Sequence, residues 1–101
     1  VYRFLGKKDL LLLNKDEEIL IYKRIVSKPP LGRTNVTNYY FSIGKEAEVQ
    51  SLTTKNLKNA FSNNEKFQVL IDKNFKYNTD LAAFDKINKI YKINWLLKQT
   101  Q

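Results

Sequence analysis

The chain has 101 residues, a formal net charge of +8, and neither histidine nor cysteine. The lack of cysteine excludes disulfides, thiolate metal sites and a cysteine nucleophile. The lack of histidine removes the commonest general base and the commonest metal ligand, so we expect a protein that is not an enzyme and holds no cofactor or metal.

The N-terminal half is typical of short antiparallel strands joined by turns. Runs of apolar, β-branched and aromatic residues predict strands over residues 1–5, 10–13, 18–27, 39–43 and 47–52. The third of these runs has apolar side chains on both faces. It should therefore be a central strand, or have its second face covered.

Three consecutive aromatic residues, Tyr39, Tyr40 and Phe41, stand in the fourth predicted strand. Such residues can form a platform on which nucleic-acid bases stack. Strand alternation instead places Tyr39 and Phe41 on one face with Ile43, which favours burial in a core. Gly44 follows and can adopt the positive φ that a hairpin turn needs.

Residues 28–38, "KPPLGRTNVTN", form the one long irregular segment. Pro29 and Pro30 cannot donate hydrogen bonds to a strand ladder. We therefore expect an exposed loop that joins two antiparallel strands, and exposed loops often contact partners.

After residue 52 the apolar spacing becomes helical. Thr53 or Thr54 should cap one short helix, and Ser62 or Asn63 a second. Residues 78–99 predict one long helix that packs on the sheet. In that helix Ile93 and Leu96 fall near the polar side, which suggests contact with another chain or with a segment that this sequence lacks.

The order of these elements predicts a single α+β domain. Four to five short strands form an antiparallel sheet within residues 1–52, which include the loop at 28–38, and residues 53–101 are helical. The longest apolar run, residues 10–13, is far too short to cross a membrane. Because the chain begins with Val1, we expect it to be a segment of a longer precursor.

The positive charge raises the possibility of nucleic-acid binding, but it is spread evenly along the chain. All but three of the 18 basic residues are lysine, the exceptions being Arg3, Arg24 and Arg33. Recognition of base edges and phosphates favours the planar fork of arginine. A codon bias toward lysine, asparagine and isoleucine explains the surplus better than a surface selected for polyanions.

Five features follow one another from residue 39 onward. They are a "YYF" strand, a short glycine turn, the pattern "L-x-x-x-N-x-K-x-x-F", a second helix marked by asparagine and a "KYNTDL" helix start. This order resembles the C-terminal region of a group of uncharacterised exported proteins of the Bacteroidota, over about residues 20–94. The resemblance implies export to the periplasm or cell surface and carries no catalytic residues. The matching positions are Tyr39, Tyr40, Phe41, Gly44, Leu52, Asn56, Lys58, Phe61, Asn64, Lys76, Tyr77, Asp80 and Leu81.

The sequence therefore suggests a non-enzymatic exported domain with an interaction or structural role in the cell envelope. Its partner would be another protein or a second copy of itself. Two other functions remain alternatives: a basic nucleic-acid-binding protein, and a module that binds a small apolar ligand between Tyr22, Phe41, Phe84 and Tyr91. A cytoplasmic location is the alternative to export. The residues expected to contact a partner are Lys28, Leu31, Arg33, Thr34, Tyr40, Ile93 and Leu96.

Overall fold

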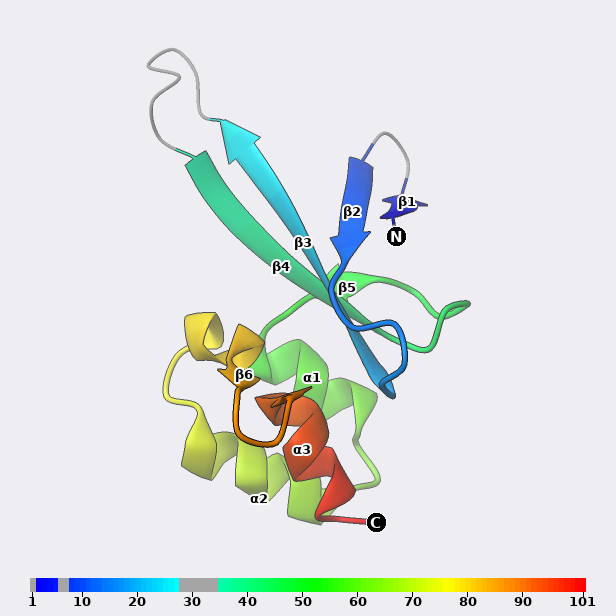
Figure 1. Cartoon of the computed structure of the whole chain (residues 1–101). Coiled ribbons are helices and arrows are strands. Elements are labelled where there is room, and N and C mark those ends of the chain that lie inside the picture. Colours follow the sequence, from blue (N-terminus) through cyan, green and yellow to red (C-terminus); the bar gives the residue numbers. More distant parts are fainter. Residues whose placement is uncertain (1, 6–7, 28–34) are drawn as a thin grey trace.

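The computed structural model of the chain describes residues 2–5, 8–27 and 35–101, which form an α+β fold (Figure 1). Within these residues one antiparallel sheet has the strand order β1-β2-β3-β4-β5, so each strand pairs with its neighbours in the sequence. The strands are β1 (Tyr2–Leu5), β2 (Lys8–Leu12), β3 (Ile19–Ser27), β4 (Asn35–Ile43) and β5 (Gln50–Ser51).

The helices follow the sheet in the chain and gather beneath one end of it, while the far ends of β3 and β4 project beyond them (Figure 1). The predicted order of strands followed by helices is thus confirmed. The elements are α1 (Thr54–Ala60), α2 (Glu65–Asn74), the 3₁₀ helix η1 (Asn78–Ala82), the two-stranded β6 (Phe84–Asp85) and β7 (Ile90–Tyr91), and α3 (Lys92–Lys98).

The prediction of one long C-terminal helix is wrong, because η1, a small hairpin and α3 replace it. The Asp85 carboxylate accepts hydrogen bonds from the main-chain N–H groups of Ile87 and Asn88, both at 3.0 Å, and from the Asn88 side chain at 2.8 Å. Such local bonds compete with helix formation. Lys89 then adopts a φ of 55°, and a right-handed α-helix cannot continue there because its residues need a negative φ.

Side-chain caps define where the first two helices begin. The Thr53 hydroxyl accepts a hydrogen bond from the Asn56 N–H at 3.0 Å, so Thr53 is the residue that caps α1. Asn64 caps α2 by accepting from the Phe67 N–H at 3.1 Å. The predicted caps for α2, Ser62 and Asn63, precede that position, since the turn after α1 extends to Asn64.

The main core lies between the helices and one face of the sheet. Phe41 is fully buried there and Tyr39 packs against the same cluster, which confirms the prediction that these two rings belong to the core. The other buried members of the cluster are Ile19, Ile21, Leu52, Leu57, Phe67, Ile71, Phe75, Leu81, Ile93 and Leu97.

A second, smaller cluster covers the opposite face of β3. Leu10, Leu20 and Tyr22 are buried together with Val49, which comes from the segment between β4 and β5. The Tyr22 hydroxyl lies 2.9 Å from the Ser42 hydroxyl, so the buried phenol is hydrogen-bonded. Strand β3 is therefore central, as its two apolar faces predict. Its first residues are covered on both faces, whereas Ile25 in its far half is 57% exposed.

Strand β4 is longer than its sequence suggests. Its pairing with β3 continues from Ile19 opposite Ile43 as far as Ser27 opposite Asn35. Residues 35–38, expected in a loop, therefore extend the strand, because they continue the antiparallel pairing with residues 24–27 of β3. Residues 28–34 of the predicted loop lie outside the described residues.

Candidate functional site

The acidic side chains near the start of β3 have a structural role. Glu17 Oε2 accepts hydrogen bonds from the Nδ2 atoms of Asn14 and Asn94, both at 2.6 Å. In the part of the chain that the structure describes, no group of three or more acidic residues is placed to hold a metal ion.

The outer edge of β4 is covered over only part of its length. Strand β5 pairs with Tyr40 and Phe41, and the Leu52 N–H donates to the Tyr39 carbonyl at 3.0 Å. The chain then leaves the sheet, because Thr53 caps α1. The start of α1 directly after Leu52 thus leaves the rest of the outer edge of β4 without a neighbouring strand among the described residues.

The main chain of Thr37 faces this uncovered side. In a strand, the N–H and C=O groups of residues two apart point to the same side. The Tyr39 carbonyl points toward Leu52, so the N–H and C=O of Thr37 point outward as well. Among residues 2–5, 8–27 and 35–101, no strand pairs with β4 at Thr37 on that side.

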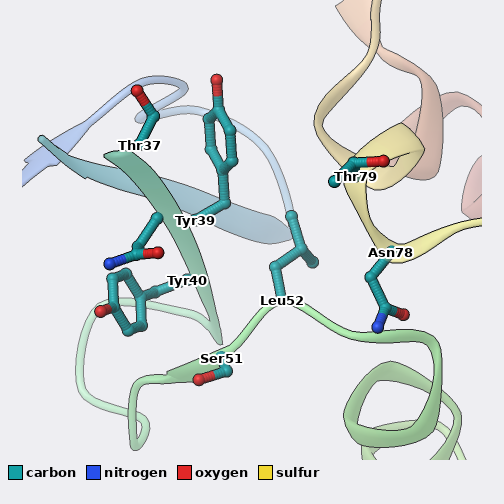
Figure 2. A pocket seen from close by; sticks show the side chains of 8 residues that line it. Thr37, Tyr39, Tyr40, Ser51, Leu52, Asn78 and Thr79 are labelled. Atoms are coloured by element: carbon teal, nitrogen blue, oxygen red, sulfur yellow. The ribbon is translucent and has the colours of Figure 1, made fainter. Parts of the chain in front are cut away.

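A pocket of about 350 Å³ adjoins the uncovered edge (Figure 2). Residues 37–40 of β4 form one wall, and Ser51 and Leu52 lie beside them. Asn78 and Thr79, at the start of η1, stand across Leu52 from the strand. The pocket therefore joins open main-chain groups to a recess with side-chain hydroxyl and amide groups.

The far wall of the pocket is tied to α1. Asn78 Oδ1 accepts a hydrogen bond from the Thr54 N–H at 2.9 Å, which satisfies one of the unpaired donors of the first turn of α1. Because Thr53 and Thr54 follow directly from the end of β5, this bond holds the start of η1 at a set distance from the strand edge.

Two tyrosines of the pocket point to opposite faces of β4, as Figure 2 shows. Tyr39 packs against the main core and Tyr40 against the smaller cluster, and each remains partly exposed. On β3, half-buried Lys23 lies opposite Tyr39, and half-buried Arg24 lies opposite Asn38. One cationic side chain therefore flanks each face of the strand.

The residues predicted to contact a partner do not form one surface. Tyr40 lines the pocket, whereas Ile93 is fully buried in the main core and Leu96 packs against that core. Ile93 therefore packs inside the domain, because α3 starts at Lys92 and its inner face differs from that of the predicted long helix. Lys28, Leu31, Arg33 and Thr34 lie outside the described residues.

The apolar pocket expected between Tyr22, Phe41, Phe84 and Tyr91 is not formed. Tyr22 and Phe41 belong to different clusters on opposite faces of the sheet. The rings of Phe84 and Tyr91 meet edge to face, with centroids 5.0 Å apart. The four rings therefore cannot surround one ligand.

Sequence reasoning missed Thr37, Asn78 and Thr79 as site residues. The sequence predicts a loop at Thr37 and offers Asn78 and Thr79 only as helix caps. One signal was present: a threonine cap directly after the returning strand implies that this strand ends early and leaves its neighbour uncovered.

None of the helices in the described part of the chain is long and apolar enough to cross a membrane. No protein-family model matches the chain, and comparisons with curated proteins and with solved structures found no match either.

Proposed function

We propose that this domain is a non-enzymatic interaction module that binds an extended segment of a partner protein along the open edge of β4. The observation that carries the proposal is the outward-facing main chain of Thr37 beside a pocket of about 350 Å³. An extended peptide that adds to such an edge gains main-chain hydrogen bonds. Its alternate side chains then enter any adjoining pocket, which supplies specificity.

The position of the edge supports this proposal. The far ends of β3 and β4 project beyond the helices (Figure 1), so a partner can approach the strand without displacing the core. Proteins commonly protect such edges against pairing with other chains. Here the described lining residues of the pocket carry no charge that would repel a strand.

An exported location and a structural or interaction role in the cell envelope are part of the proposal. They are supported by the resemblance of residues 20–94 to exported proteins of the Bacteroidota. Single-strand binding by base stacking needs exposed aromatics, and the full burial of Phe41 weighs against such a platform.

The test is a selection of random peptides displayed on phage against the purified chain, with nuclear magnetic resonance used to locate the bound peptide. We expect the selected peptides to shift the amide signals of residues 37–40 and of Asn78. Thr37→Pro should weaken binding about tenfold, because proline lacks the outward N–H. Thr37→Ala keeps that N–H and is the matched control, with affinity changed less than about threefold.

Peptides whose signals map elsewhere, or that bind Thr37→Pro as well as wild type, would contradict the proposed site. A random oligonucleotide, titrated at increasing salt, provides the second arm. Binding that weakens steeply with salt and involves the lysines would favour the nucleic-acid function instead.

A further inference from the structure

We infer that the partner segment is acidic, an inference that rests on the proposed function. Lys23 and Arg24 are neighbours in β3 and lie opposite Tyr39 and Asn38 of the open strand. Because successive side chains alternate, Lys23 lies on the face of Tyr39, and Arg24 lies on the other face. A strand added to β4 would thus have a cation near each of its two faces.

The spacing of strands brings these cations within range. Neighbouring strands lie about 4.8 Å apart, so a peptide beside β4 would be about 10 Å from the main chain of β3. Long basic side chains and glutamate side chains together span that separation. The same distance is close to the screening length at moderate salt, so the attraction should depend on ionic strength.

Few negative charges oppose this attraction near the pocket. The described residues that line it are uncharged. Asp80 follows Asn78 and Thr79 in η1, and its carboxylate already accepts a hydrogen bond from the Tyr77 N–H at 3.2 Å. An acidic peptide beside β4 therefore meets an uncharged pocket, with Lys23 and Arg24 one strand away on β3.

The net charge of this chain also indicates which kind of segment can bind at the open edge of β4. A second copy of this chain would bring another net charge of +8 to the same edge, which like-charge repulsion disfavours. A basic peptide is disfavoured for the same reason. An acidic segment of another protein is the occupant that the charges of this chain favour.

Two octapeptides test the inference with the full chain. One alternates valine with glutamate and the other alternates valine with lysine, so they share length and strand propensity and differ in charge. We expect the glutamate peptide to bind at least about tenfold more tightly and to shift the Thr37 amide signal. Its affinity should fall as salt rises from low to physiological concentration.

Charge variants of the protein sharpen the test. Replacing Lys23 and Arg24 together by glutamine should reduce the preference for the glutamate peptide to less than about threefold. The matched control replaces Lys66 and Lys73, which are exposed on α2, and removes the same total charge. This control should keep the preference, because helix α2, which carries both lysines, lies away from the sheet (Figure 1).

The outcomes separate the two proposals. If display-selected peptides map to residues 37–40 but are neutral or basic, or if the two octapeptides bind equally well there, the acidic inference fails and the proposed function stands. If no peptide shifts the signals of these residues, both fail. Equal loss of preference in the two charge variants would attribute the effect to net charge and overturn the role of Lys23 and Arg24.

Discussion

The side-chain amide of Asn94 in α3 hydrogen-bonds both main-chain groups of Ile19 at the start of β3. The Ile19 N–H donates to Asn94 Oδ1 at 2.9 Å, and Asn94 Nδ2 donates to the Ile19 carbonyl at 2.9 Å. This buried amide acts as a neighbouring strand would, since it satisfies one donor and one acceptor of the β3 main chain. It therefore joins the last helix directly to the central strand.

A second asparagine completes the attachment. Asn14 Oδ1 accepts from the Ile21 N–H at 2.6 Å, and Asn14 Nδ2 donates to the Ile19 carbonyl at 2.8 Å. The described pairing of β2 with β3 includes Leu11 and Leu12 but does not reach Ile19. At the start of β3, where β2 no longer pairs with it, the side chains of the two asparagines thus supply the hydrogen bonds that a neighbouring strand would make.

Replacing Asn94 by leucine should therefore destabilise the fold. Leucine has a similar size but cannot bond to Ile19, whose buried N–H would lose its partner. An unsatisfied buried donor costs about 1–3 kcal/mol, so we expect the free energy of unfolding in urea to fall by about 2–3 kcal/mol. The matched control is Asn59→Leu on the exposed face of α1, with a change within about 0.5 kcal/mol. Equal effects at the two positions would show that the Asn94 bonds do not stabilise the protein.

Ile93 provides a test of the corrected helix register. Because its side chain is fully buried in the main core, Ile93→Ala should lower the free energy of unfolding by about 2–5 kcal/mol without any partner present. Ile87 is 92% exposed at the tip of the hairpin, so Ile87→Ala should change it by less than about 0.5 kcal/mol. Thermal or urea unfolding of both variants gives the comparison. A neutral Ile93→Ala would favour the original prediction that Ile93 faces a partner.

The sheet was largely predictable because strand alternation is a local property. Apolar residues on both faces of β3 indicated a central strand, and the alternation of Tyr39, Phe41 and Ile43 indicated a core face. Pairing with β3 extends β4 to residues 35–38, where the two asparagines and the preceding proline and glycine residues favour a loop. In such a strand, pairing with the neighbouring strand determines the conformation more strongly than the strand propensity of the residues themselves.

The C-terminal region was not predictable in the same way. Residues 78–99 have helical apolar spacing, yet Asp85 and Asn88 stop the helix through a local turn. The bonds of Asn94 to Ile19 depend on contact between residues far apart in the sequence. The candidate site depends on such contacts too, because the bond of Asn78 to Thr54 joins residues 24 positions apart in the sequence.

Substitutions of Gly44 test whether the turn after β4 needs a residue with positive φ. Its φ is +86°, a conformation that costs an L-residue with a side chain about 1–2 kcal/mol. A methyl group built at Gly44 meets no atom within 4 Å, so backbone strain alone should determine the effect. We expect Gly44→Ala to lower the free energy of unfolding by about 1 kcal/mol. Gly44→Asn should cost less, because asparagine adopts positive φ more readily. A larger loss with asparagine would instead indicate a steric origin.

Alkaline pH should weaken the fold through Tyr91. Burial raises the pKa of the Tyr91 phenol above its ordinary value of 10.0, and the nearby charge of Glu17 and the Tyr39 phenol raise it further. The folded state therefore holds this proton more tightly than the unfolded state. The resulting stabilisation is complete below pH 10 and is lost as pH rises through the folded-state pKa. Urea unfolding at several pH values between 8 and 11.5 measures this loss.

Tyr91→Phe removes the titrating phenol and keeps the ring that meets Phe84 edge to face. The free energy of unfolding of this variant should therefore fall less between pH 9 and 11 than that of the wild type. Tyr77→Phe, which removes a phenol hydroxyl from a side chain that is 60% exposed, is the matched control for the substitution itself. If Tyr91→Phe also declines in parallel with the wild type, the Tyr91 phenol is not held in its neutral form by the fold, and the inferred effect of its burial on its pKa is wrong.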